Sequence, residues 1–164
     1  MAPRASAVLT LGPGRHDEAD MTEIDIDLTR RESFRHWTPV TIRFCDQDSM
    51  AHVNNVALAA YVEAARTALI YELIRKGGME GLEFILARVL IDFHRELHYP
   101  GAVEVGARLT RIGGKSLTTG YGIFRGDACI ATSTCVNVFY DMATRRSVAP
   151  PQSVRAALEA ELAG

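Results

Sequence analysis

Residues 44–66 read FCDQDSMAHVNNVALAAYVEAAR, with a polar segment followed by an alanine-rich run. Residues 40–45, which run into it, alternate between apolar and polar side chains, and this is the period of a half-buried strand. Residues 46–50 are polar and predict a turn. The Asn54-Asn55 pair is a good helix N-cap, and residues 56–76 contain no glycine or proline. The stretch therefore predicts a strand, a polar loop and the start of one long helix.

The expected helix is apolar on nearly every side and stops at Gly77-Gly78. Up to Ile70, only Glu63, Arg66 and Thr67 interrupt its apolar surface. Because a helix that is apolar all round is typically buried, we expect this one to lie inside the fold. Its many alanines are expected to let a sheet approach closely.

Four further segments are rich in strand-forming residues and are separated by turns that contain glycine. They cover residues 84–93, 103–110, 116–124 and 128–140. A short helix is expected over residues 153–162. The predicted order is one strand, the long helix and then four strands in a meander. This order corresponds to an α+β domain, in which an antiparallel sheet of about five strands wraps one central helix.

The composition is that of a globular protein with a single domain. Of its 164 residues, 48% are hydrophobic and 23% are charged, and the formal net charge is −2. Because nucleic acids and anionic membranes attract a strong positive field, this balance argues against both as main partners. No apolar run approaches the ~20 residues of a membrane helix. The three cysteines lack metal-binding spacing, which favours reduced thiols and a cytoplasmic location.

The first 35 residues differ from the rest of the chain. Gly12-Pro13-Gly14 breaks regular structure, and residues 16–31 are dense in charge. We expect residues 1–35 to form a flexible N-terminal arm that buries little, and residues 36–164 to form the single domain.

Five polar residues crowd the junction between strand and helix: Asp46, Asp48, His52, Asn54 and Asn55. A helix N-terminus offers free N–H groups and a positive dipole end, which suit a developing oxyanion. A carboxylate just before it is placed to attack a carbonyl held there, or to activate water against that carbonyl. The alternative is structural, because Asp and Asn are common in turns and helix caps. The residues alone leave both interpretations open.

Two motifs in this region resemble a known family. Asp48-x3-His52-Val53-Asn54-Asn55, followed by Tyr61-x-Glu63-x2-Arg66, is similar to the D-x-x-x-H-V-N-N…Y-x-E-x-A-R signature of hotdog-fold acyl-CoA thioesterases, the 4-hydroxybenzoyl-CoA thioesterase-like group. Residues 87–101 and 111–116 fit the same pattern. The resemblance covers about residues 38–158.

The resemblance implies a hotdog fold and hydrolysis of an acyl-CoA thioester to a free acid and CoA. It also implies a homodimer or homotetramer in which the acyl group lies against the partner subunit. No metal ion and no separate cofactor are expected, because CoA is part of the substrate. One departure is Ala51, where many members have glycine, since a glycine-favoured backbone angle would strain an alanine.

The resemblance also assigns roles to individual residues. Asp48 is expected to be the nucleophile or general base, and the backbone N–H near Asn55 is expected to polarise the thioester carbonyl. The expected site residues are Asp48, His52 and Asn55 for catalysis and Asn54, Tyr61 and Glu63 for substrate binding.

Several of these residues have a structural alternative. Asp48 forms an Asx-turn readily, and Asp46 is expected to be a solvated carboxylate of the turn. His52 is suited either to orient substrate or water or to hydrogen-bond the loop to the helix. Glu63 lies on an apolar helix and needs a partner, for which Arg66 at i+3 is a candidate. We favour a structural or site-lining role for Glu63 and keep it as the second candidate for the base.

The remaining chemistry-bearing residues are expected to be structural. His94 and His98 form an HxxxH pattern beside Asp92, but that spacing gathers metal ligands on a helix, and this segment reads as strand and turn. Cys45 is expected to be a half-buried thiol. Three scattered cations are expected to be surface charges rather than contacts to CoA phosphates: Lys115, Arg145 and Arg146.

Two other functions compete with thioester hydrolysis. Enoyl-CoA hydratases of the same fold usually show a D-x-N-P-x-H pattern, which Asp48–His52 lacks. A module that binds or senses acyl-CoA without turnover is the other alternative. Loss of the acidic residue would favour such a module, but Asp48 is present.

Overall fold

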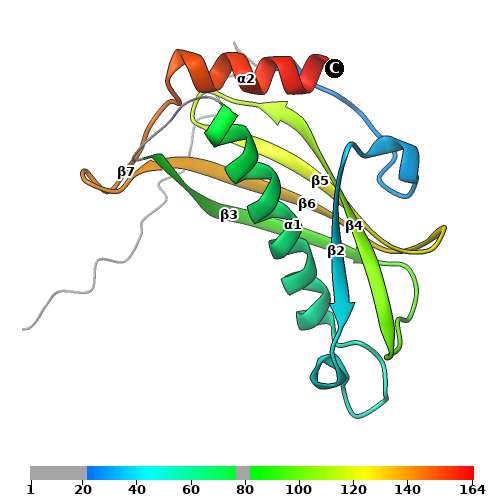
Figure 1. Ribbon diagram of the computed structural model, residues 1–164. Coiled ribbons are helices and arrows are strands. Elements are labelled where there is room, and N and C mark those ends of the chain that lie inside the picture. The colour runs from blue at the N-terminus through cyan, green and yellow to red at the C-terminus, as the bar shows by residue number, and fades with distance from the viewer. Residues whose placement is uncertain (1–21, 77–81) are drawn as a thin grey trace, which may run out of the picture.

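The computed structural model of the chain describes residues 22–76 and 82–164. The 22-residue helix α1 (Asn55–Lys76) lies across one face of a curled antiparallel sheet, and α2 (Gln152–Ala163) lies over one end of that sheet (Figure 1). The five long strands are β2 (His36–Ile42), β3 (Leu82–Phe93), β4 (Gly101–Ile112), β5 (Ser116–Arg125) and β6 (Ala128–Asp141). Short elements complete the described chain: β1 (Thr22–Glu23), β7 (Arg146–Ser147) and two 3-10 turns, Arg31–Ser33 and Phe44–Asp46. The predicted α+β architecture of one long helix on a sheet of about five strands is confirmed.

The strands are ordered β1-β4-β5-β6-β3, and β2 also pairs with β4. The hairpin between β5 and β6 is as predicted, since Arg125 pairs with Ala128 across a turn in which Gly126 has a φ of +59°. The predicted meander is wrong for β3, which pairs with β6 and not with β4. Its place beside β4 is taken by β2 and β1. β3 is therefore the far edge of the described sheet.

The strand before the helix is shifted from its predicted place at residues 40–45. β2 starts at His36 and ends at Ile42, after which the chain turns through Phe44–Asp46. The Asp46 carboxylate accepts a hydrogen bond from the Arg43 N–H (2.8 Å), and the Asp46 N–H donates to the Arg43 carbonyl (3.0 Å). This local turn ends the strand. Phe44, expected on the buried face, is 75% exposed.

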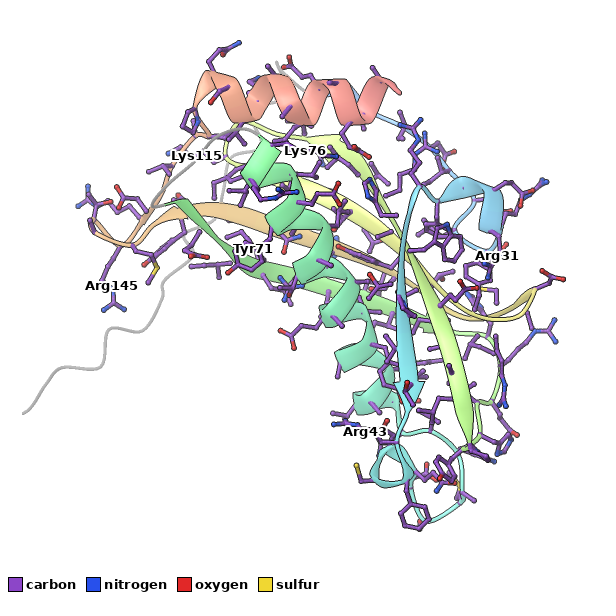
Figure 2. The ribbon with its side chains drawn as sticks, in the orientation of Figure 1. Arg31, Arg43, Tyr71, Lys76, Lys115 and Arg145 are labelled. Atoms are coloured by element: carbon purple, nitrogen blue, oxygen red, sulfur yellow. The ribbon has the colours of Figure 1, made fainter. Side chains whose placement is uncertain are left out.

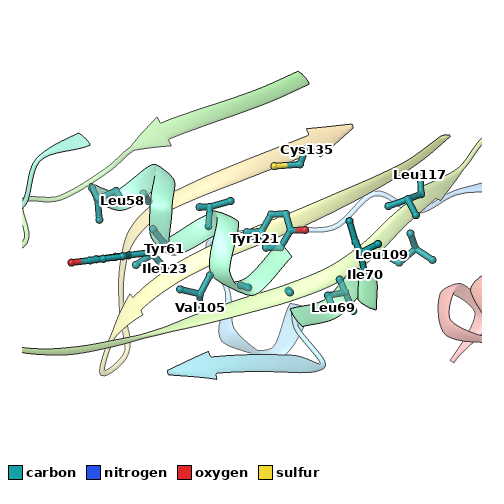
Figure 3. Packing of buried hydrophobic residues seen from close by; sticks show 14 of the residues in the cluster. Leu58, Tyr61, Leu69, Ile70, Val105, Leu109, Leu117, Tyr121, Ile123 and Cys135 are labelled. Carbon is teal, nitrogen blue, oxygen red and sulfur yellow. The ribbon is translucent and has the colours of Figure 1, made fainter. Parts of the chain in front are cut away.

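The buried face of α1 packs into the main hydrophobic core. Figure 3 shows Leu58, Leu69 and Ile70 of the helix beside side chains from β4, β5 and β6. The core residues from those strands include Val105, Leu109, Leu117, Tyr121, Ile123 and Cys135. Within the described residues, neither helix is long and apolar enough to cross a membrane.

The opposite face of α1 is not covered by the described chain, and the expectation of a helix buried all round is wrong here. Val56 is 76% exposed and Tyr71 is 49% exposed, and Ala60, Ala64 and Ala68 are also exposed. The reason is that the sheet packs on one side of the helix only. An apolar, alanine-rich helix face is left open.

The expected N-terminal arm falls partly outside the described residues, which begin at residue 22. Its described part packs on the sheet, so the expectation that this segment buries little is wrong there. Phe34 is 6% exposed, and a Cβ on Gly106 of β4 would lie 2.5 Å from the Phe34 ring. A Cβ on Gly122 of β5 would also contact this ring. The Phe34 ring therefore packs over two glycines on neighbouring strands, where no side chain is in the way. The boundary at residue 36 stays a prediction.

Candidate active site

A cleft of about 430 Å³ opens where α1 begins. Two segments line it, one leading into the helix and one leaving β3. The lining residues are Asp48, Met50, His52, Val53, Asn54, Asn55 and Leu58 from the first, and Phe93, His94, Arg95, Glu96 and Leu97 from the second. The cleft thus contains four of the six predicted site residues.

Backbone hydrogen bonds join the two segments. The Val53 N–H donates to the Leu97 carbonyl (2.7 Å), which holds the loop before α1 against the segment after β3. The Asn54 N–H donates to the Asp46 carbonyl (2.8 Å) and ties the same loop to the end of the preceding turn. These bonds fix the walls of the cleft.

Asp48 closes the loop on itself. Its carboxylate Oδ1 accepts the N–H groups of Met50 (2.8 Å) and His52 (3.2 Å), and its own N–H donates to the His52 carbonyl (2.9 Å). The Asx-turn alternative is therefore real, but it uses one carboxylate oxygen only. Asp48 Oδ2 takes no part in these bonds, so the turn orients the carboxylate and leaves one oxygen for chemistry.

Ala51 has the backbone angle anticipated for this loop. Its φ is +62°, in the left-handed region that favours glycine. The closure of the Asp48 turn holds the alanine there, because the Ala51 N–H donates to the Asp48 carbonyl (3.1 Å).

The start of α1 has the features of an oxyanion site. Asn54 caps the helix, since its Oδ1 accepts the Val56 N–H (2.8 Å) and its carbonyl accepts the N–H of Leu58 (3.1 Å). Asn55 is the first helical residue, and among the described residues no hydrogen bond uses its N–H. That N–H lies at the positive end of the helix dipole and belongs to a residue that lines the cleft.

Asp46 lies in a different environment from the solvated turn that was expected. It is buried, and its Oδ1 forms an ion pair with the Arg43 guanidinium (2.7 Å) while its Oδ2 accepts the Tyr61 hydroxyl (2.6 Å). Hydrogen bonds from Arg43 and Tyr61 lower the pKa of Asp46 to about 2, against burial, which raises it. The correction follows from these partners, which keep the carboxylate ionised inside the protein.

Tyr61 is thereby engaged away from the cleft. Its ring is buried, and burial together with the hydrogen bond to Asp46 raises the pKa of its hydroxyl. It does not contribute to the lining of the cleft that contains Asp48. A role in substrate binding stays a prediction.

Glu63 lies farther along α1, in a second cleft of about 290 Å³ between the helix and β3. The candidate partner is confirmed, because Arg66 Nη2 is 3.1 Å from Glu63 Oε1. Arg66 is buried and also donates to Asn137 Oδ1 (3.1 Å), whereas the Glu63 side chain is 68% exposed. Glu63 therefore meets Arg66 at the rim of this second cleft.

The residues expected to be structural take the following places. His94 Nε2 is 2.9 Å from the Thr132 hydroxyl, away from His98. Cys45 is exposed, not half-buried as expected, because it lies in the turn that ends β2.

Figure 2 shows Lys115 and Arg145 at the opposite end of α1 from Arg43, which lies beside the loop before the helix. The cation missed by sequence reasoning is Arg95, which lines the cleft.

The missed residues of the cleft belong to the segment after β3. Arg95 and Glu96 follow β3 after one intervening histidine, so the signal was a charged run just beyond a strand end. Nothing in that run shows that it meets the loop before α1. The pairing of Val53 with Leu97 supplies this information.

Comparisons with known proteins identify the family and the fold of the chain. A family model described as the thioesterase-like superfamily matches residues 42–158. The chain belongs to the thioesterase-like superfamily. Its sequence resemblance and hotdog fold are thereby confirmed, and thioester hydrolysis is the general chemistry that this superfamily supports. No curated protein matches the chain.

Solved structures of this superfamily's fold are similar over most of the chain. A protein of Pseudomonas aeruginosa strain PAO1 is 30% identical, with a TM-score of 0.69, over 80% of this chain and 94% of that one. A predicted thioesterase from Bacillus stearothermophilus is 25% identical (TM-score 0.70, 77% and 95% covered). A thioesterase from Thermus thermophilus, complexed with coenzyme A and Zn, is 26% identical (TM-score 0.70, 81% and 98% covered).

Proposed function

We propose that the chain hydrolyses an acyl-CoA thioester to a free acid and CoA. The observation that carries the proposal is that the Asp48 carboxylate and the first N–H of α1, at Asn55, belong to one cleft. The thioesterase-like superfamily supports the reaction, and the coenzyme A complex of the Thermus thermophilus relative supports CoA as the leaving group.

The chemistry follows from the two groups. The thioester carbonyl oxygen accepts the Asn55 N–H, and the helix dipole stabilises the negative charge that develops on this oxygen. Asp48 Oδ2 either attacks the carbonyl carbon or removes a proton from the water that attacks it. The C–S bond then breaks and the CoA thiolate takes up a proton. On the direct route, water afterwards cleaves the acyl–Asp48 anhydride and restores the carboxylate.

Other residues of the site have supporting roles in this proposal. His52 lies on the Asp48 loop and lines the same cleft, and in this proposal it orients substrate or water. Asn54 holds the start of the helix, and the open cleft at Glu63 is suited to the acyl chain because apolar side chains form most of its lining. Arg95, at the edge of the first cleft, is a candidate contact for a CoA phosphate.

We also propose that two copies of the chain join along β3. In the described sheet, β3 pairs with β6 only, so its other edge has unpaired backbone groups. Four large apolar residues of β3 are exposed: Leu86, Val89, Leu90 and Phe93. A second copy would cover these side chains and the apolar cleft beside α1.

The test is turnover of short, medium, long and aromatic acyl-CoAs, followed as release of free CoA thiol, with Asp48→Asn in parallel. Asparagine keeps the Oδ1 acceptor for the Met50 and His52 N–H groups, so the loop is expected to stay folded. Removing the carboxylate is expected to lower kcat by about 10²-fold or more.

Asp141→Asn is the matched control. Asp141 Oδ1 also accepts two backbone N–H groups, those of Ala143 (2.7 Å) and Thr144 (3.1 Å), but it does not line the cleft. Its turnover is expected to equal that of the wild type. Activity that survives in Asp48→Asn would mean that Glu63 or His52 is the catalytic base. Tight acyl-CoA binding without thiol release would refute hydrolysis and favour a binding module or a hydratase.

A further inference from the structure

Three side chains of metal-binding type lie together at the edge of the first cleft: His52, Glu96 and His98. Their ligand atoms all lie within 4.8 Å of one another, and no other such group occurs in residues 22–76 and 82–164. Glu96 Oε2 is 3.4 Å from His52 Nε2 and 3.7 Å from His98 Nε2. The two imidazole rings meet edge to face, with centroids 5.0 Å apart.

These separations match shared coordination better than hydrogen bonding. An N–H···O hydrogen bond spans about 2.7–3.2 Å, which is shorter than both distances to Glu96. Ligand atoms about 2.0–2.2 Å from one tetrahedral ion are about 3.3–3.6 Å from each other. Both distances to Glu96 are close to this edge length. The ligand nitrogens of the two imidazoles lie within 4.8 Å of each other.

The imidazole of His98 makes a hydrogen bond through the nitrogen that does not face Glu96, as metal-binding histidines commonly do. Its Nδ1 is 3.1 Å from the Ala51 carbonyl oxygen, and a carbonyl accepts only, so Nδ1 carries the proton. Nε2 is then the nitrogen with the free lone pair, and it faces Glu96. A backbone carbonyl on the outer nitrogen fixes the tautomer and the ring plane of a metal ligand.

We propose that His52, Glu96 and His98 bind one divalent transition-metal ion of the zinc class. Two imidazoles and one carboxylate form a donor set that suits Zn²⁺ or Co²⁺, whereas Mg²⁺ and Ca²⁺ prefer oxygen ligands. Three protein ligands leave a fourth position for water. The Glu96 and His98 side chains are 68% and 51% exposed, so an ion reaches the site from solvent.

This site differs from the histidine pair that the sequence singles out. In the HxxxH pattern, His94 points to Thr132, and His98 joins His52 from the other segment of the cleft. The sequence led us to expect no metal ion, and the proposal departs from that expectation. The three ligands come from two separate segments, so only the folded chain brings them together.

The test is titration of the full-length protein, freed of any purification tag, with Co²⁺ and then Zn²⁺. Visible absorption of Co²⁺ reports a four-coordinate site, and Zn²⁺ is followed by its displacement of Co²⁺. We expect one ion per chain. Replacement of one ligand, in His98→Ala or in Glu96→Gln, is expected to weaken binding by about 10-fold or more.

Two controls separate this site from incidental binding. His94→Gln changes a neighbouring histidine outside the ligand set, and Cys45→Ser removes the exposed thiol, so both are expected to bind Co²⁺ as the wild type does. Glu96 is exposed, so Glu96→Gln tests the proposal even if His98→Ala fails to fold. Unchanged affinity in Glu96→Gln, loss of binding in Cys45→Ser, or no four-coordinate Co²⁺ spectrum in the wild type would each overturn the proposal.

Discussion

At the scale of single residues, Asp46 and Asp48 show how two neighbouring carboxylates receive different tasks. Asp46 is buried between the Arg43 guanidinium and the Tyr61 hydroxyl, and both of its oxygens are engaged. Asp48 is partly exposed and uses only Oδ1 for its turn. The first carboxylate fixes the end of β2 against α1, and the second is left with an oxygen that is available for chemistry.

The ionisation of Asp46 predicts how stability depends on acid. Its folded-state pKa, about 2, lies below the ordinary value of 3.8, so its contribution is present above pH 4 and is lost as the pH falls towards 2. The difference corresponds to about 2 kcal/mol. Between pH 5 and pH 2, the free energy of unfolding of the wild type is expected to fall by about 2 kcal/mol more than that of Asp46→Asn. Urea unfolding at each pH measures this, and parallel curves would contradict it.

The left-handed backbone of Ala51 predicts a stabilising substitution. The left-handed conformation costs an L-residue roughly 1–2 kcal/mol of conformational energy, and glycine is free of this strain. Glycine offsets part of the gain because it loses more backbone entropy on folding. Ala51→Gly is expected to raise the free energy of unfolding by about 0.5–1 kcal/mol. Arg145 also has a positive φ, +55°, so Arg145→Gly is expected to behave similarly. A loss of stability in both variants would show that neither backbone is strained.

At the scale of elements, the sequence predicted the features that depend on neighbouring residues only. The cap at Asn54 and the uninterrupted run to Lys76 define α1, and the Gly126 turn defines the β5–β6 hairpin. The place of β3 beside β6 was not predictable, because strand pairing depends on which edge is free and not on the strand's own residues. Phe34 was missed for the same reason, since its burial depends on Gly106, which is remote in sequence.

Phe34 and Phe44 form a natural pair for testing that the segment before β2 belongs to the core. Phe34 is 6% exposed and Phe44 is 75% exposed. Phe34→Ala is expected to lower the free energy of unfolding by about 3 kcal/mol, because it removes a buried ring and leaves a cavity over the sheet. Phe44→Ala is expected to change it by less than about 0.5 kcal/mol. Chemical denaturation measures both, and equal effects would mean that the segment contributes nothing to the core.

At the scale of the whole molecule, the candidate site is a product of topology. Asp48, His52 and the helix start were readable because they form one contiguous motif. Arg95, Glu96 and His98 join them through the contact between two loops, which no local pattern contains. The same holds for the uncovered face of α1, because the sequence shows that the helix is apolar but not which molecule covers each side.

The open edge of β3 predicts an assembly that can be broken by one charge. Val89 is 47% exposed on β3, and a lysine there would place a charge among apolar side chains at the proposed contact between two copies. Val89→Lys is expected to halve the mass measured by light scattering and to reduce turnover. Met142→Lys, at an apolar residue that is 62% exposed outside β3, is expected to keep the wild-type mass. A wild-type monomer with full activity, or a Val89→Lys variant of unchanged mass, would refute the proposed contact along β3.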